Sequence, residues 1–202
     1  MSGDSGLSTR DAENVAISAN AHLALADLPS CVASLGHIAV GMAAGRGWSE
    51  RAGTSPWRAM VGFATLSMSP DIDVVGMALG VPYGAPWGHR GATHALLTAI
   101  VAGTAVATLA RRRGERWLPR VALACVTLAS HGLLDAMTDG GMGIALLWPF
   151  TTHRFFLPWR PIPVAPIGMG ILTGSGLTVM AWEALVFLPF FAYALWPRAP
   201  RS

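Results

Sequence analysis

The chain contains 202 residues, of which 52% are hydrophobic and only 12% are charged. Soluble domains carry about 25% charged residues, so this composition favours a membrane protein over a soluble one. The net charge of +3 comes from arginines in short loops between apolar runs, and this distribution, without a basic stripe, argues against a nucleic-acid partner.

Four apolar runs in the first two thirds of the chain predict helices. The run 91–110 has twenty residues, which at 1.5 Å each match the roughly 30 Å thickness of the hydrocarbon core. The run 117–137 follows after six residues, so the two are expected to form an antiparallel helical hairpin, whereas the earlier runs 31–45 and 57–68 are marginal as full spans. Small residues spaced four apart favour close helix packing in lipid, namely Ala99, Gly103 and Ala107, and also Gly170 and Gly174.

The last third of the chain predicts one more crossing. The run 167–196 is long enough to span and carries Pro189 as an expected kink, while the preceding segment 139–166 is rich in Gly, Pro and aromatic residues. We expect that segment to be irregular and to lie at the membrane interface. The fold class expected is all-α, a polytopic transmembrane helical bundle of about four to five spans. Its parts are an N-terminal extension (1–30), a membrane-embedded domain (31–196) and a C-terminal tail (197–202).

Arginine positions predict the orientation in the membrane. Ten of the fourteen arginines lie in the segments 46–58, 111–120 and 198–201. The positive-inside rule assigns these segments to the cytoplasm. The other end of each apolar run is therefore expected on the non-cytoplasmic side.

Histidines and aspartates gather toward that other end. His131 and Asp135 are spaced i and i+4, so they share one face of a helix. His94 lies 17 residues before Arg111 and His131 lies 14 residues after Trp117, so their depths in the hairpin differ by roughly 5 Å. Ionisable groups at membrane depth are expensive and usually functional, so this convergence predicts a site.

The first two runs extend the same pattern. His37 precedes Arg46 by nine residues and Asp71 follows Arg58 by thirteen, which again indicates the non-cytoplasmic half. Imidazole and carboxylate ligands of this kind suit a divalent metal, with Zn²⁺ preferred over Mn²⁺ or Fe²⁺. Six candidates exceed the needs of one tetrahedral zinc, so either two ions are bound or some residues act as supporting groups or as a general base. The candidate metal ligands are His37, Asp71, Asp73, His94, His131 and Asp135.

Some of these residues also have plainer interpretations. The SPDID turn could simply cap the next helix, and Arg90 could contact lipid headgroups. His153 and Arg154 lie among aromatic residues and are expected at the interface. Glu183 lies within the last apolar run and must pair with something, whether Arg90, a histidine or the metal.

Five motifs, taken in order, resemble one known family. They are GHIAVG, PDID, GHRGATHALL, SHGLLDAMT and LLWPF followed by RFFLP, and together they cover about residues 35–160. They resemble the membrane-bound metal-dependent hydrolases of the YdjM/YbcI type, which are described as LexA-regulated in some bacteria. The resemblance implies an integral inner-membrane protein and a metal-dependent hydrolase, without identifying a substrate.

The family pattern transfers to this sequence with two departures. Val74 stands where the family often has a histidine after the PDID motif, and Ala95 stands where it has a serine. A metal site that needed that histidine would be incomplete here, and no hydroxyl is available at position 95. The residues to which the resemblance assigns the site are His37, Asp71, Asp73, His89, Arg90, His94, His131 and Asp135.

The expected function is hydrolysis of a lipid-like or amphiphilic phosphodiester or ester by a metal-activated water. Asp73 is expected to bridge metals or to act as a base, and His89 and Arg90 are expected to stabilise developing negative charge. Membrane lipids are the expected partners, and the sequence predicts no oligomeric state. Two alternatives remain open here, a metal-ion or proton transporter and a non-catalytic membrane protein in which the metal only staples helices together.

Overall fold

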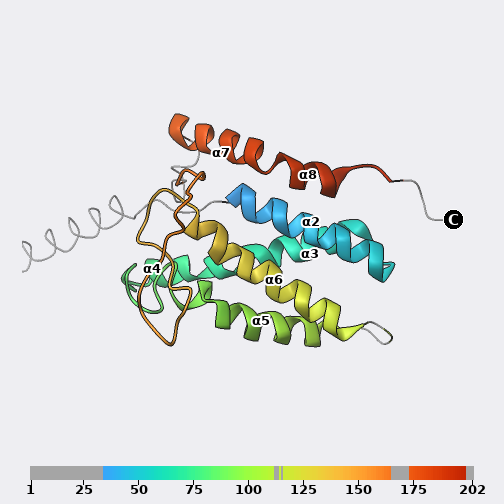
Figure 1. Ribbon diagram of the computed structural model, residues 1–202, viewed down its shortest axis with the longest axis horizontal. Coiled ribbons are helices and arrows are strands. Elements are labelled where there is room, and N and C mark those ends of the chain that lie inside the picture. The colour runs from blue at the N-terminus through green and yellow to red at the C-terminus, as the bar shows by residue number, and fades with distance from the viewer. Residues whose placement is uncertain (1–33, 112–113, 115, 165–172, 199–202) are drawn as a thin grey trace, which may run out of the picture.

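The computed structural model describes residues 34–111, 114, 116–164 and 173–198, and in these segments all regular secondary structure is helical (Figure 1). This confirms the all-α class. Two isolated bridges, Thr138 with Ile162 and Ile144 with Phe155, join loop segments. The helices are α2 (Ser34–Ala52), α3 (Pro56–Met68), η1 (Ser69–Asp73), α4 (Val74–Ala78), η2 (Ala92–His94), α5 (Leu96–Leu109), α6 (Trp117–Ala136), α7 (Gly174–Val186) and α8 (Leu188–Leu195).

The helices form a layered bundle with two distinct ends. α2 pairs with α3, and α5 pairs with α6 as the expected hairpin. α2 also contacts α6, and α7 and α8 pack along the other side of α2 (Figure 1). The loops after α4 and α6 gather at the left end in Figure 1, whereas the last turn of α5 and the first turn of α6 lie at the opposite end.

Several helix boundaries differ from those expected. α2 continues through the arginine-containing segment to Ala52, so the loop to α3 is reduced to residues 53–55. α5 begins at Leu96 rather than at residue 91, because residues 92–94 form the short helix η2 and Ala95 is extended. α6 agrees with the expected run to within one residue.

Two parts of the described chain are suited to cross a bilayer. α6 has 20 residues and is apolar enough to do so alone, and α7 with α8 passes the same test together but is bent by 62° at Phe187. Pro189 lies in the first turn of α8, so the expected kink is present as a break. α5 is apolar but has 14 residues, which at 1.5 Å each give about 21 Å. Length and composition thus identify one or two of the expected spans.

The outer faces of the bundle are apolar. Val101 on α5, Val126 on α6 and Leu185 on α7 are all exposed, and other large hydrophobic side chains of the same helices are exposed as well. Water-soluble monomers rarely expose contiguous apolar surface of this kind. The exposed faces therefore suit a lipid environment.

Small residues set the spacing of the hairpin, as expected. Ala99, Gly103 and Ala107 are buried along α5, and a Cβ atom at Gly103 would approach the Cα of Cys125 to 2.8 Å. At Gly174 a Cβ atom would meet no atom of the described residues within 4 Å, so the described part of the chain shows no close packing there. Its expected companion Gly170 lies outside the described residues.

The segment after α6 is irregular, as predicted, over its described part up to residue 164. Main-chain hydrogen bonds between Asp139 and Ile162 and between Ile144 and Phe155 fold it back on itself. Residues 165–166, the N-terminal extension and residues 199–202 of the tail lie outside the described residues.

Candidate metal centre

Side chains from four separate segments meet at the end of the bundle where η1, α4 and η2 lie. His37 is in the first turn of α2, and η1 carries Asp71 and Asp73. η2 ends at His94, and α6 presents His131 and Asp135 one turn apart. All six are buried except Asp71, whose side chain is 11% exposed. The convergence expected from the sequence is thus observed.

Four of these side chains surround one point. Ligand atoms of Asp71, His94, His131 and Asp135 all lie within 4.8 Å of one another. The two Nε2 atoms of His94 and His131 are 3.0 Å apart. Asp71 Oδ1 lies 3.4 Å and 3.3 Å from these nitrogens, and Asp135 Oδ2 lies 3.2 Å and 3.6 Å from them.

These separations fit a tetrahedral zinc ion. Zinc binds imidazole nitrogen and carboxylate oxygen at about 2.0–2.1 Å, which places neighbouring ligand atoms of a tetrahedron about 3.3 Å apart. The five nitrogen–nitrogen and nitrogen–oxygen distances above span 3.0–3.6 Å. The residues present therefore match the size of such a coordination sphere.

His94 and His131 are oriented alike. In each ring Nδ1 faces a hydrogen-bond acceptor and Nε2 faces the four-ligand cluster. His131 Nδ1 lies 2.7 Å from the carbonyl oxygen of Ser67, which can only accept, so this nitrogen carries the proton. His94 Nδ1 faces Asp73 Oδ2 at 3.2 Å and is protonated by the same reasoning. In the neutral rings both Nε2 atoms present lone pairs to one another and to two carboxylates, which suits a bound cation; without one, a proton on His94 Nε2 would take its place.

Charge balance favours a divalent cation. Three carboxylates, Asp71, Asp73 and Asp135, contact the cluster, and Arg90 is the cation in direct contact with it, through Asp135. With neutral histidines the cluster carries two more negative than positive charges. Buried charges are tolerated when they are paired or coordinate a metal, so a divalent ion fits.

Asp73 lies next to the four-ligand cluster and orients the residues around it through hydrogen bonds. Its Oδ1 accepts from His89 Nδ1 at 2.7 Å, and its Oδ2 accepts from Thr93 Oγ1 at 2.5 Å and from the Arg90 main-chain N–H at 3.2 Å, in addition to facing His94. A carboxylate or carbonyl behind each metal-binding histidine fixes its tautomer and orientation. Asp73 does this for His94, and the Ser67 carbonyl does it for His131.

Asp71 and Asp73 are held in the ionised form. Burial opposes ionisation of both, but hydrogen bonds from His89 and His94 to Asp73, and without a bound ion those from His131 and His94 to Asp71, outweigh it. The pKa of each carboxyl is therefore below its ordinary range. Both carboxylates are ready to bind a cation at neutral pH.

Asp73, His89 and His94 form a second cluster with ligand atoms within 4.8 Å. Its atoms are already joined by the hydrogen bonds just described, and His94 already turns Nε2 toward the first cluster. One ion at the first cluster, with the second cluster as its support, explains the geometry most simply.

His37 lies beside the four ligands rather than among them. Its ring stacks on that of His131, with centroids 3.8 Å apart and 16° between the planes. Its Nε2 is 3.3 Å from Asp135 Oδ1, whereas the His94 and His131 nitrogens lie near the other oxygen of this carboxylate, Oδ2. The structure therefore places this expected ligand in a supporting position, because α2 packs behind α6 at this depth.

Arg90 is directed into the protein. It is fully buried with φ of 61°, an unusual value for a residue with a side chain. Its Nε lies 3.5 Å from Asp135 Oδ2, and its Nη1 donates to Thr138 Oγ1 at 3.0 Å and to the Gly140 carbonyl at 3.1 Å. This geometry ties Asp135 to the turn after α6 and does not indicate contact with lipid headgroups.

Glu183 has a partner that the sequence did not suggest. Its Oε2 accepts from the main-chain N–H groups of Leu35 and Gly36, at 2.9 Å and 3.3 Å. The expectation of direct pairing with Arg90, a histidine or the metal is thus replaced by capping of the N-terminus of α2, where a carboxylate is favoured by the helix dipole. This contact anchors α7 beside His37.

Sequence reasoning missed Arg154 as a structural residue of the site. It was expected at the interface, but its Nη1 donates to the carbonyls of His89 and Gly143 and its Nη2 to those of Tyr83 and Ala85, at 3.1–3.3 Å. It thereby fixes the loop that carries His89. Carbonyl partners leave no signal in a sequence, whereas Thr93 could have been noticed from its place beside His94.

Comparison with known proteins identifies the family. The family model described as "YdjM inner membrane protein" matches residues 32–199. The chain is 39% identical over 160 residues to "Inner membrane protein YbcI" of Escherichia coli (strain K12), a match that covers 76% of this chain and 89% of that protein. No solved structure matches the chain. Both descriptions state a location and no activity. Over most of its length, the chain belongs to the YdjM family of inner membrane proteins.

Proposed function

We propose that this protein is an integral-membrane metal-dependent hydrolase with one zinc ion as its first candidate cofactor. The observation that carries the proposal is the set of four ligand atoms, from Asp71, His94, His131 and Asp135, at the mutual distances of a tetrahedral metal site. A buried group of carboxylates and imidazoles without this role would be costly to maintain.

The residues around the four ligands support hydrolytic chemistry. A divalent metal held here supplies Lewis acidity, which makes water a competent nucleophile near neutral pH. Asp73 accepts a hydrogen bond from His89 Nδ1 at 2.7 Å, as the carboxylate of an acid–base dyad does from its imidazole. We therefore assign proton transfer to His89 and the orientation of its ring to Asp73. Arg90 keeps Asp135 in place and contributes positive charge next to the reacting centre.

An amphiphile is the proposed substrate class. Asp71 is the most exposed of the four ligands, and the residue after it, Ile72, is 71% exposed. Val75 and Leu79, which follow in the next few residues, are also exposed and apolar. A phosphodiester or ester with an apolar tail could approach Asp71 over this surface.

We also propose the finer topology of four to five spans, with the metal centre toward the non-cytoplasmic side. The arginine-rich connections lie at the end of the bundle away from the centre, which supports this orientation (Figure 1).

The test uses full-length protein purified in detergent, stripped with a chelator and reloaded with zinc, manganese or iron. Loaded protein is expected to hydrolyse fluorogenic phosphodiester or ester lipids, and His131→Ala is expected to lose both bound metal and at least 100-fold of the turnover. His153→Ala, an exposed histidine away from the centre, serves as the matched control. Unchanged turnover in His131→Ala would exclude the proposed mechanism.

One observation favours a second candidate, in which the metal has a structural role only. Four protein ligands already fill a tetrahedron, as in closed structural zinc sites, whereas catalytic sites keep one position open. In that case metal removal lowers the melting temperature, yet no amphiphile tested is hydrolysed. The transporter alternative has less support, because the ionisable cluster lies at one end of the bundle rather than along its depth.

A further inference from the structure

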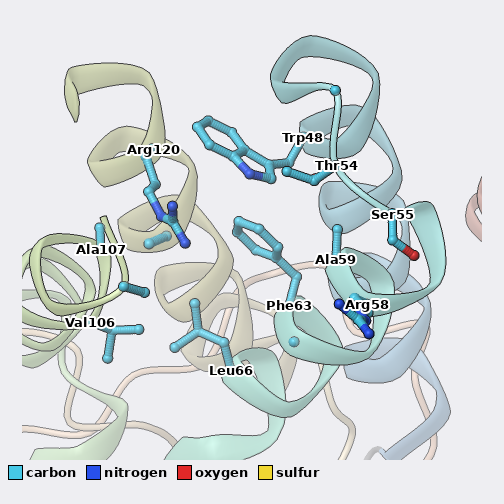
Figure 2. A pocket seen from close by; sticks show the side chains of 14 residues that line it. Trp48, Thr54, Ser55, Arg58, Ala59, Phe63, Leu66, Val106, Ala107 and Arg120 are labelled. Atoms are coloured by element: carbon cyan, nitrogen blue, oxygen red, sulfur yellow. The ribbon is translucent and has the colours of Figure 1, made fainter. Parts of the chain in front are cut away.

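A cavity lies at the opposite end of the bundle from the metal centre. It has a volume of about 410 Å³, opens to the outside, and is lined by residues of α3, α5 and α6, of the turn between α2 and α3, and by Trp48 of α2. Figure 2 shows Arg120 of α6 and Arg58 of α3 on opposite sides of the Phe63 ring. Nothing in the chemistry proposed above uses this cavity.

The rim of this cavity is basic and polar. Arg58 and Arg120 line it together with Ser55 and Thr54, and none of the described residues that line it is acidic. Arg120 also lies over the Trp48 ring at 5.4 Å from its centroid, which fixes the guanidinium at the rim. The Thr54 hydroxyl is buried and has no hydrogen-bond partner within the described chain. These groups suit an anion with several oxygen atoms.

The interior of the cavity is apolar. Phe63 and Leu66 on α3 and Val106 on α5 line it below the arginines. Leu66 lies eight residues beyond Arg58 on the same helix, which corresponds to about 12 Å along the helix axis. The lining of the cavity therefore changes from charged at the rim to apolar toward the bundle interior. The same order, headgroup first and apolar tail second, is found in an amphiphile that enters from one membrane interface.

We propose that this cavity binds an anionic phospholipid. Its phosphate would lie at the basic rim that Arg58 and Arg120 provide, where a guanidinium group forms charge-assisted hydrogen bonds with phosphate oxygens, and an acyl chain would follow Phe63 and Leu66. Basic pockets between transmembrane helices on the cytoplasmic side are suited to anionic headgroups. The arginine-rich end of this bundle provides that setting, and a bound lipid would link α3 to α6.

Lipid selectivity of purified full-length protein tests the proposal. Native mass spectrometry in detergent would compare phosphatidylglycerol with phosphatidylcholine at matched acyl chains. We expect the wild type to retain phosphatidylglycerol selectively, and the double variant R58Q/R120Q to weaken that binding at least tenfold. R111Q/R116Q removes the same charge at the same end from two exposed arginines outside the cavity, and it is expected to change binding less than threefold.

A third variant tests the apolar part without changing charge. Gly62 lines the cavity and a Cβ atom there meets nothing within 4 Å, so Gly62→Leu fills the space for the acyl chain and should also weaken binding. Because the arginine variants are judged by the difference between two lipids, a general loss of stability cannot imitate their result, and the melting temperature of Gly62→Leu controls for its stability. Equal retention of both lipids by the wild type, equal losses in the two arginine double variants, competition by inorganic phosphate alone, or full binding by Gly62→Leu would each overturn the proposal.

Discussion

At the scale of single residues, the two ring nitrogens of His94 and of His131 have different partners. In each ring Nδ1 is held by a fixed acceptor, Asp73 Oδ2 or the Ser67 carbonyl, while Nε2 faces the two carboxylates. The positions of these histidines could be predicted from the sequence, since i and i+4 spacing and helix depth are readable there. The orientation of their rings could not, because a main-chain carbonyl from another helix decides it.

Asp73→Asn tests the supporting role of this carboxylate. Asparagine keeps the size of the side chain but loses the charge that holds His89 and His94. Loss of such a supporting partner typically lowers metal affinity about 10- to 100-fold without removing the ligands. Competition with a chromogenic chelator would measure the change.

The matched control for that measurement is Asp139→Asn. Asp139 is exposed and accepts a hydrogen bond from the Val164 main chain at 2.8 Å, away from the four ligands. Its substitution should leave metal affinity within twofold of wild type. Equal effects in the two variants would argue against a specific role for Asp73.

At the scale of elements, short helices and turns bring the ligands together. η1 follows α3 without a break, and η2 precedes α5, so that Asp71 and His94 face α6. The sequence predicted α6 well, because a charged connection and a Thr-Asp-Gly-Gly stretch bound its apolar run. It did not predict η2, because GATH carries no strong helix or turn signal and its conformation depends on contact with α6.

Gly132 on α6 is the residue that permits this contact. A Cβ atom at this position would lie 2.5 Å from the His94 carbonyl oxygen, so Gly132→Ala must push η2 away from α6. Overpacking of this kind costs about 1–3 kcal/mol, and here it also separates His94 from His131. We expect a lower melting temperature and at least tenfold weaker metal binding, measured by calorimetry and chelator competition.

Gly174→Ala is the matched control, since a Cβ atom at that position meets no atom of the described residues within 4 Å. It should leave both the melting temperature and the metal affinity near those of wild type. If Gly132→Ala also bound metal like wild type, the close approach of η2 and α6 would not be needed to form the centre.

At the scale of the whole molecule, the bundle has an arginine-rich end and a metal-binding end. Composition and arginine positions predicted this polarity, and the family assignment establishes the inner membrane as the location. The full number of crossings was less predictable, because α5 is short and the pair α7 and α8 is bent, so neither has the simple length of a spanning helix.

Cysteine labelling tests the orientation of the two ends. In a variant without Cys31 and Cys125, Leu79→Cys places a thiol at an 81% exposed position near the metal centre. We expect an impermeant maleimide to label it in intact spheroplasts. Arg111→Cys, at the other end, should be labelled only after the membrane is permeabilised. The reverse pattern would place the metal centre on the cytoplasmic side.

X-ray absorption at the edge of the copurifying metal tests the existence of the centre most directly. Full-length protein is expected to show a first shell of about four nitrogen and oxygen atoms at about 2.0–2.1 Å, with the outer-shell signal of two imidazoles. In His94→Ala and His131→Ala that signal should weaken along with the amount of bound metal. A shell containing sulfur, or a wild-type protein that binds no divalent metal after reloading, would contradict the account.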